Sequence, residues 1–226
     1  MNEMSSAMNI GRIENAKARN RIYALLAMGF RYPDEEVFSQ LADGAYADAI
    51  VNALAVCAAD IAGGCQDSLA GLWATGPRQE LEAAYISAFE TNMPEPSISL
   101  YEGSHHLHGN KPELLLELKS FYRAFGLTMA EAENDLEDSL TAELEFMQFL
   151  TAKQVQAEDG TLDKSPYLRA QKDFLERHLA AWLPPLLAEA EGKLKSPFYK
   201  ALIALANNFV ALDAKAVKRD VADRGA

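Results

Sequence analysis

The sequence predicts an all-α fold, a single globular domain of roughly nine helices. Composition is the first indication, because Ala, Leu and Glu dominate the 226 residues and runs of β-branched residues are scarce. Hydrophobic spacing is the second, because Ile22, Leu25 and Phe30 recur at intervals that place them on one helical face. Hydrophobic residues make up 49% of the chain and charged residues 24%, which suits a folded core and excludes wholesale disorder.

Proline and glycine residues set the expected helix ends. Pro33 and Gly126 follow apolar runs and predict that helices end there, whereas Pro112 fits the first turn of a helix. Pro184 and Pro185 are expected to interrupt a long helix, because proline lacks the amide hydrogen that a helix interior needs. The expected helices cover residues 13–30, 34–41, 46–62, 78–89, 112–125, 139–158, 165–183 and 197–212.

An acidic stretch divides the expected domain into two parts. We expect a front part over about residues 10–126, a hinge over about 127–139 and a back part over about 140–212. The polar tail after the back part is expected to fray. No internal repeat is visible, which argues against a helical repeat array.

The chain is acidic, with 21 Lys and Arg against 33 Asp and Glu and a formal net charge of −12. Such a surface repels nucleic acid and anionic lipid, so we expect no nucleic-acid partner and favour a basic one. No stretch reaches the roughly 18 apolar residues of a membrane span, so no stable membrane insertion is expected. Cys57 and Cys65 are too few for a disulfide scaffold, and no secretory signal is visible, so we expect a cytoplasmic protein.

An irregular stretch over Thr91–Glu113 stands between the helices. Its prolines and glycines exclude a continuous helix, and long loops of this kind are often functional. His105, His106 and His108 lie close together in it and could bind a transition metal. Glu102 and His105 also have the E-x-x-H spacing of di-iron helical bundles. A metal-binding helical enzyme is therefore an alternative, although no second E-x-x-H pair, nucleophile motif or nucleotide-binding loop accompanies the histidines. No cofactor is expected.

Acidic residues gather before and within the following helix, and two interpretations are open. One is a helix start, since Asp138 and Ser139 are good N-caps and carboxylates favour a first turn. The other is attraction of a peptide that carries arginines followed by an apolar run, with aromatic residues such as Tyr85 and Phe89 lining its groove. The acidic residues are Glu131, Glu133, Asp135, Glu137, Asp138, Glu143 and Glu145.

Three motifs follow one another along the chain. They are YISAF from Tyr85 to Phe89, PSISLYE from Pro96 to Glu102, and DSL from Asp138 to Leu140, which runs into Glu143 and Glu145. In this order the chain resembles the TorD/DmsD/NarJ family of cytoplasmic chaperones for molybdoenzymes. Ala88 stands where the family has leucine, and Ser139 where many members have a histidine, so a titratable imidazole is absent from that position. These departures resemble the subgroup that serves type II dimethyl-sulfoxide-reductase-like enzymes, among them chlorate and selenate reductases.

The resemblance implies a TorD-like helical fold and a chaperone rather than an enzyme. Members bind the twin-arginine leader or N-terminal region of the catalytic subunit of a molybdopterin oxidoreductase, and hold it until cofactor insertion and folding are complete. Both a monomer and a domain-swapped dimer are compatible with it, and a helical scaffold for another protein partner is the remaining alternative. The residues expected to bind the leader are Tyr85, Phe89, Pro96, Ser99, Tyr101, Glu102, Asp138, Ser139, Leu140, Glu143 and Glu145.

Overall fold

The structure, a computed structural model, describes residues 2–59, 69–90, 98–105, 110–128, 136–158 and 163–225. Side chains are described between residues 10 and 223 of these ranges. Pro96, His106, His108 and the acidic residues 131–135 lie outside the described residues. Most of the expected hinge does too, so the division into front and back parts stays a prediction.

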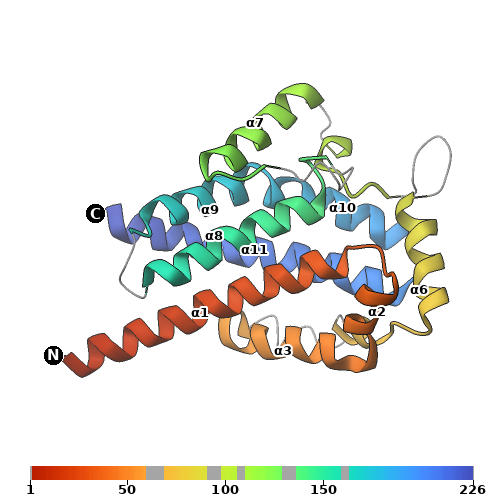
Figure 1. Ribbon diagram of the computed structural model, residues 1–226, viewed down its shortest axis with the longest axis horizontal. Helices are drawn as coiled ribbons and strands as arrows, with labels where there is room; N and C mark the ends of the chain where they lie inside the picture. The colour runs from red at the N-terminus through yellow and green to blue at the C-terminus, as the bar shows by residue number, and fades with distance from the viewer. Residues whose placement is uncertain are drawn as a thin grey trace.

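The described residues form helices joined by turns, which confirms the all-α prediction (Figure 1). They also contain an isolated antiparallel bridge between Tyr101 and Ser139. None of the helices within these ranges is long and apolar enough to cross a membrane. The α-helices are α1 (Asn2–Gly29), α2 (Glu35–Leu41), α3 (Ala45–Cys57), α6 (Arg78–Tyr85), α7 (Lys111–Ala124), α8 (Leu140–Glu158), α9 (Ser165–Arg177), α10 (Leu179–Lys193) and α11 (Pro197–Gly225).

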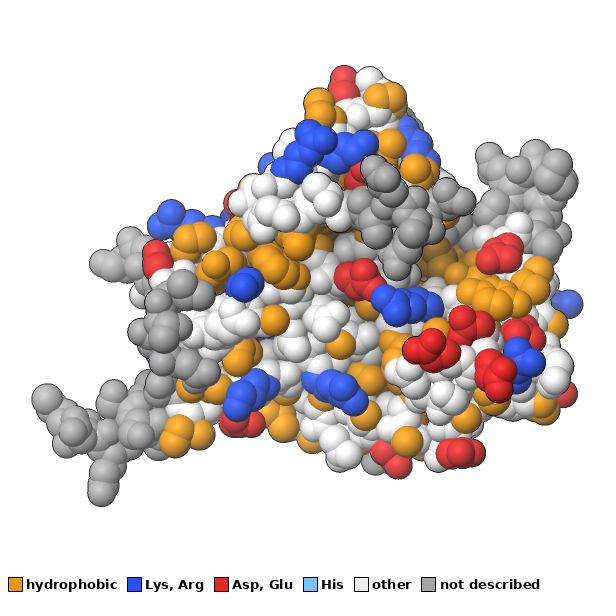
Figure 2. Space-filling view, in the orientation of Figure 1, with side chains coloured by type: hydrophobic (Ala, Val, Ile, Leu, Met, Phe, Trp, Pro, Cys, Tyr) orange, Lys and Arg blue, Asp and Glu red, His pale blue; other side chains and the backbone are white. Residues whose placement is uncertain are grey.

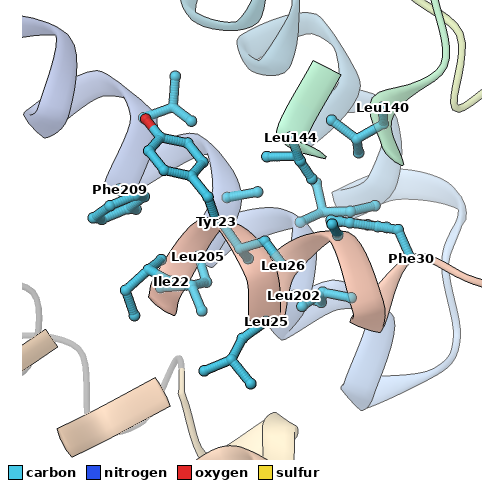
Figure 3. Close-up of a cluster of buried hydrophobic side chains, with 14 of the residues drawn as sticks. Ile22, Tyr23, Leu25, Leu26, Phe30, Leu140, Leu144, Leu202, Leu205 and Phe209 are labelled. Carbon is cyan, nitrogen blue, oxygen red and sulfur yellow. The ribbon is translucent and has the colours of Figure 1, made fainter. Parts of the chain in front are cut away.

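The long helices pack lengthwise around one apolar core. α1 packs against α8 and α3, while α11 packs against α9 and α10 (Figure 1). Figure 3 shows Leu26 of α1 and Phe30, which directly follows α1, together with Leu144 of α8 and Leu202 of α11, and all four side chains are buried. Burial of such side chains supplies most of the stabilisation of a helical bundle. α7 stands at the outer edge of the bundle (Figure 1).

A buried ion pair ties the first described helix to the last. Arg19 Nε lies 2.5 Å from Asp213 Oδ1, and the two side chains are only 5% and 3% exposed. Tyr23 Oη donates a hydrogen bond to the same carboxylate at 2.7 Å. The guanidinium also donates to Gln154 of α8 at 3.0 Å and to Gln171 of α9 at 2.6 Å. The network therefore fixes α1, α8, α9 and α11 relative to one another.

The expected helix over residues 165–183 breaks at His178, where φ is −118° and ψ is −98°, so the prediction of a break at Pro184 and Pro185 was wrong. Both prolines lie inside α10. They sit on its exposed face, where backbone carbonyls that lose a helical partner can be solvated. The chain turns one residue before α10 instead, where the His178 ring is directed into the interior.

The segment after Leu212 also differs from the expectation. It was expected to fray, but α11 continues to Gly225. Asp213 and Val217 are 2% and 1% exposed and lie four residues apart, so they share the buried face of the helix. Val221, four residues further on, packs partly buried against the same core. The buried face thus extends the helix past the last long apolar run.

We predict that Arg19→Met lowers the free energy of unfolding by about 3–5 kcal/mol, because it leaves the Asp213 carboxylate buried without its cation. Urea denaturation followed by circular dichroism measures this. Lys17→Ala is the control, because Lys17 is 54% exposed on the same helix, and it should change the stability by less than about 0.5 kcal/mol. Equal losses for the two variants would contradict a special role for the buried pair.

Candidate functional site

Main-chain hydrogen bonds at the Tyr101–Ser139 bridge join the loop before α7 to the start of α8. The Glu102 amide donates to the Asp138 carbonyl at 2.8 Å, and the Leu140 amide donates to a loop carbonyl at 2.8 Å. Ser139 Oγ accepts from a backbone amide three residues later at 3.2 Å and so caps α8. The structure therefore brings the second and third motifs together, and a serine suffices at the cap.

Glu102 and Glu143 lie fully buried behind this bridge. Glu102 pairs with His178, whose Nδ1 lies 3.0 Å from Oε2. Trp182 Nε1 donates to Glu143 Oε2 at 3.0 Å. These two carboxylates hold the loop, α8 and the start of α10 together. A direct contact of either with a leader stays a prediction.

Burial raises the pKa of the Glu143 carboxyl well above its usual range, and the nearby charge of Glu102 raises it further. The hydrogen bond from Trp182 favours the ionised form and opposes this shift, but it is the smaller effect. The folded protein therefore binds a proton at Glu143 more tightly than the unfolded chain does.

Asp138 also stabilises the region of the Tyr101–Ser139 bridge, and it too is 0% exposed. Its Oδ2 accepts from the Gly103 amide at 3.1 Å and lies 3.6 Å from Lys111 Nζ. A Cβ at Gly103 would lie 2.8 Å from that oxygen, so the approach requires glycine. The Lys111 ammonium also lies over the Tyr101 ring, 5.7 Å from its centroid. The Asp138 carboxylate is therefore shielded from solvent in this structure.

Two histidines pack beside these carboxylates. The His105 ring stacks on Trp182 with centroids 5.2 Å apart, and its Nε2 lies 2.8 Å from the Ser99 carbonyl oxygen. Sequence reasoning overlooked His178, because its partner Glu102 lies 76 residues earlier and no local spacing signals the pair. Within the described residues, no three His, Cys, Asp or Glu side chains are placed to hold a metal ion.

The YISAF motif forms an aromatic wall at the end of α6. Tyr85 lies edge-to-face against Tyr32 and Phe89, with ring centroids 5.5 and 5.1 Å apart. Its Oη donates to the Phe30 carbonyl at 3.2 Å. Tyr199 of α11 supports Tyr85 and Phe89 from the interior side. Phe89 is buried and Tyr85 partly exposed, so Tyr85 forms the outer surface of the wall.

Other aromatic residues near the loop pack against the core. Phe121, Tyr122 and Phe125 all contact the Phe146 ring, with centroids 6.4, 4.9 and 6.0 Å away. Tyr122 Oη donates to the Glu137 carbonyl at 2.8 Å. These contacts attach the α7 segment to α8, so these rings have a structural role.

A groove of about 710 Å³ opens between the end of α1, α2, Tyr85 and α8. Asp34, Glu36 and Glu145 line it, and Arg31 is the one Lys or Arg among its described lining residues. Arg31 Nη2 lies 2.5 Å from Glu145 Oε1, and the side chains are 52% and 38% exposed. Figure 2 shows acidic side chains gathered over the end formed by α2 and α6, next to hydrophobic ones. The groove can therefore accept a peptide with cationic and apolar side chains.

Of the predicted leader-binding residues, the structure places Tyr85 and Glu145 at this groove. Sequence reasoning missed Arg31, Tyr32 and Asp34, which follow α1 and lie far along the chain from the motifs. The predicted residues that are described but do not line the groove are Phe89, Ser99, Tyr101, Glu102, Asp138, Ser139, Leu140 and Glu143.

Comparison with known proteins gives consistent matches. Residues 50–188 match the family described as nitrate reductase delta subunit. The chain is 49% identical to the perchlorate reductase assembly chaperone protein of Dechloromonas aromatica, over 93% of this chain and 94% of that one. It is 31% identical to the selenate reductase assembly chaperone protein of Thauera selenatis, over 80% of each. A crystal structure of a proposed redox enzyme maturation protein from Archaeoglobus fulgidus shares the fold, with a TM-score of 0.50 and 16% identity over 85% of this chain and 93% of that one.

We predict that Glu143→Gln becomes progressively more stable relative to the wild type as the pH rises. Because folding raises the pKa of the Glu143 carboxyl, the wild-type protein loses stability as the pH rises above the ordinary carboxyl pKa of 4.5. A glutamine has no proton to lose, so the variant is spared this loss. The glutamine keeps an acceptor oxygen for Trp182. Urea denaturation of both proteins between about pH 5 and pH 8 measures the difference. A difference that stays constant over this range would contradict the raised pKa.

Proposed function

The chain belongs to the nitrate reductase delta subunit family, the TorD/DmsD/NarJ family that its motifs resemble, and from this premise we propose that it is the assembly chaperone of a molybdenum-cofactor oxidoreductase. The family and the named relatives are assembly chaperones and not catalysts, so the chain is not an enzyme. The observation that carries the proposed role is the relationship to the perchlorate reductase chaperone, which extends over nearly the whole chain.

The proposed client is the catalytic subunit of an oxyanion reductase. Both named relatives are chaperones of such enzymes, one for perchlorate and one for selenate. Selenate reductase is also one of the type II enzymes served by the subgroup that the motifs resemble. We place the chaperone in the cytoplasm, where it would hold the subunit until cofactor insertion and folding are complete.

We assign the client's leader or N-terminal region to the groove beside Tyr85 and Glu145. Arginines of the leader would form charge-assisted hydrogen bonds with Glu145, Asp34 or Glu36. Its apolar run would cover the aromatic wall and the aliphatic lining, which includes Met28. Because these carboxylates lie near solvent, their pairs would be weak and exchangeable, which suits a client that must later leave.

The two alternatives have less support. A metal-binding enzyme would need His105, but its ring is stacked on Trp182 and its Nε2 faces a backbone carbonyl. His106 and His108 lie outside the described residues. A scaffold for an unrelated partner has less support because both named relatives are reductase assembly chaperones.

Affinity purification of the tagged chain from its native host, followed by mass spectrometry, tests the role. We expect the catalytic subunit of a molybdenum-cofactor oxidoreductase to co-purify with its leader still attached. Recovery of a different partner, under conditions in which such a subunit is expressed, would favour the scaffold alternative.

We predict that Glu145→Gln weakens leader binding by less than about fivefold and lowers its salt dependence, because the leader loses an exposed ion pair that it makes in exchange for the Arg31–Glu145 pair. Fluorescence polarisation of a labelled peptide, with two adjacent arginines ahead of an apolar run, measures both. Glu189→Gln is the matched control, because Glu189 is 40% exposed and also ion-paired but lies away from the groove. Equal effects of the two substitutions would argue against this placement.

A further inference from the structure

Arg31 occupies the position that a bound arginine would need. Its guanidinium lies 2.5 Å from Glu145 Oε1, and both residues line the groove together with Tyr32 and Tyr85. No other Lys or Arg lines the groove within the described residues. A guanidinium from a peptide could reach the Glu145 oxygens only by sharing or replacing this contact.

The Arg31 side chain can leave without disturbing the core. It is 52% exposed and follows the last turn of α1, between buried Phe30 and Tyr32, which is 39% exposed. Phe30 anchors the backbone there, while the amide of Arg31 donates to the Met28 carbonyl at 3.2 Å. Only an exposed side chain has to rotate, so exchange would be rapid and reversible.

We propose that Arg31 is a built-in competitor for the leader's arginine, which must displace it from Glu145 to bind. The inference rests on the proposed function and adds how the site is regulated. Arg31 lowers the affinity of every basic segment for the groove by the same factor. Segments whose affinity is already weak then no longer occupy the groove. A client leader, which also covers the aromatic wall, retains enough affinity to bind.

The size of the effect follows from the strength of the pair. Exposed ion pairs form with equilibrium constants of about one to five. Pairing with Arg31 therefore lowers the fraction of molecules with a free Glu145 carboxylate by a factor of about two to six. Removing the competitor should tighten binding by that factor. This gain in affinity should disappear when Glu145 is replaced by a neutral residue, because Arg31 then has no carboxylate to pair with.

The test is a double-mutant cycle with the labelled peptide that carries two adjacent arginines. We expect Arg31→Ala to bind it about two to six times more tightly than the wild type, with a steeper salt dependence. In a Glu145→Gln background, Arg31→Ala should bring little further change. Arg21→Ala, which removes an exposed cation of α1 that does not line the groove, controls for net charge and should leave the affinity nearly unchanged.

Two other outcomes separate the inference from the proposed function. If the wild type binds and Glu145→Gln weakens binding, but Arg31→Ala does not tighten it, the competitor is excluded and the groove stands. The same holds if Arg31→Ala tightens binding equally with and without the Glu145 charge. If neither the wild type nor Arg31→Ala binds the peptide, the groove assignment fails, and the inference fails with it.

Discussion

The rest of the structure depends on the buried pair of Arg19 and Asp213. A guanidinium and a carboxylate that leave water must each be fully partnered, and here the partners come from four helices. The network therefore constrains how α1, α8, α9 and α11 pack against one another. The apolar core in Figure 3 lies along α1, α8 and α11, and the groove opens where α1 ends.

The acidic residues that the sequence groups together do two different things. Glu102, Asp138 and Glu143 are buried, and their contacts with His178, Gly103 and Trp182 hold the loop, α8 and the start of α10 together. Glu145, two residues after Glu143, faces the groove. The first group determines where the second can act, because the Tyr101–Ser139 bridge fixes the start of α8. Substitutions in the buried group would therefore affect binding indirectly, through folding.

The sequence was sufficient for the fold and only partly for the site. Apolar spacing located most helices, and the resemblance of the motifs identified the family. Helical spacing could also have separated Glu143 from Glu145, because Glu143 shares the face of Leu140 and Met147. Long-range pairs were beyond reach: Glu102 meets His178 across 76 residues, and Arg31 meets Glu145 across 114. Such contacts depend on tertiary packing, which no local pattern encodes.

The support that α11 gives to the groove has a consequence for synthesis on the ribosome. Tyr199 backs the aromatic wall, Leu202 lies in the core with Phe30, and Asp213 neutralises Arg19. All three residues are translated after every element that lines the groove. A nascent chain that has not released α11 therefore carries an unpaired Arg19 and an unsupported Tyr85. The groove is therefore complete only once α11 has emerged and packed against α1 and α6.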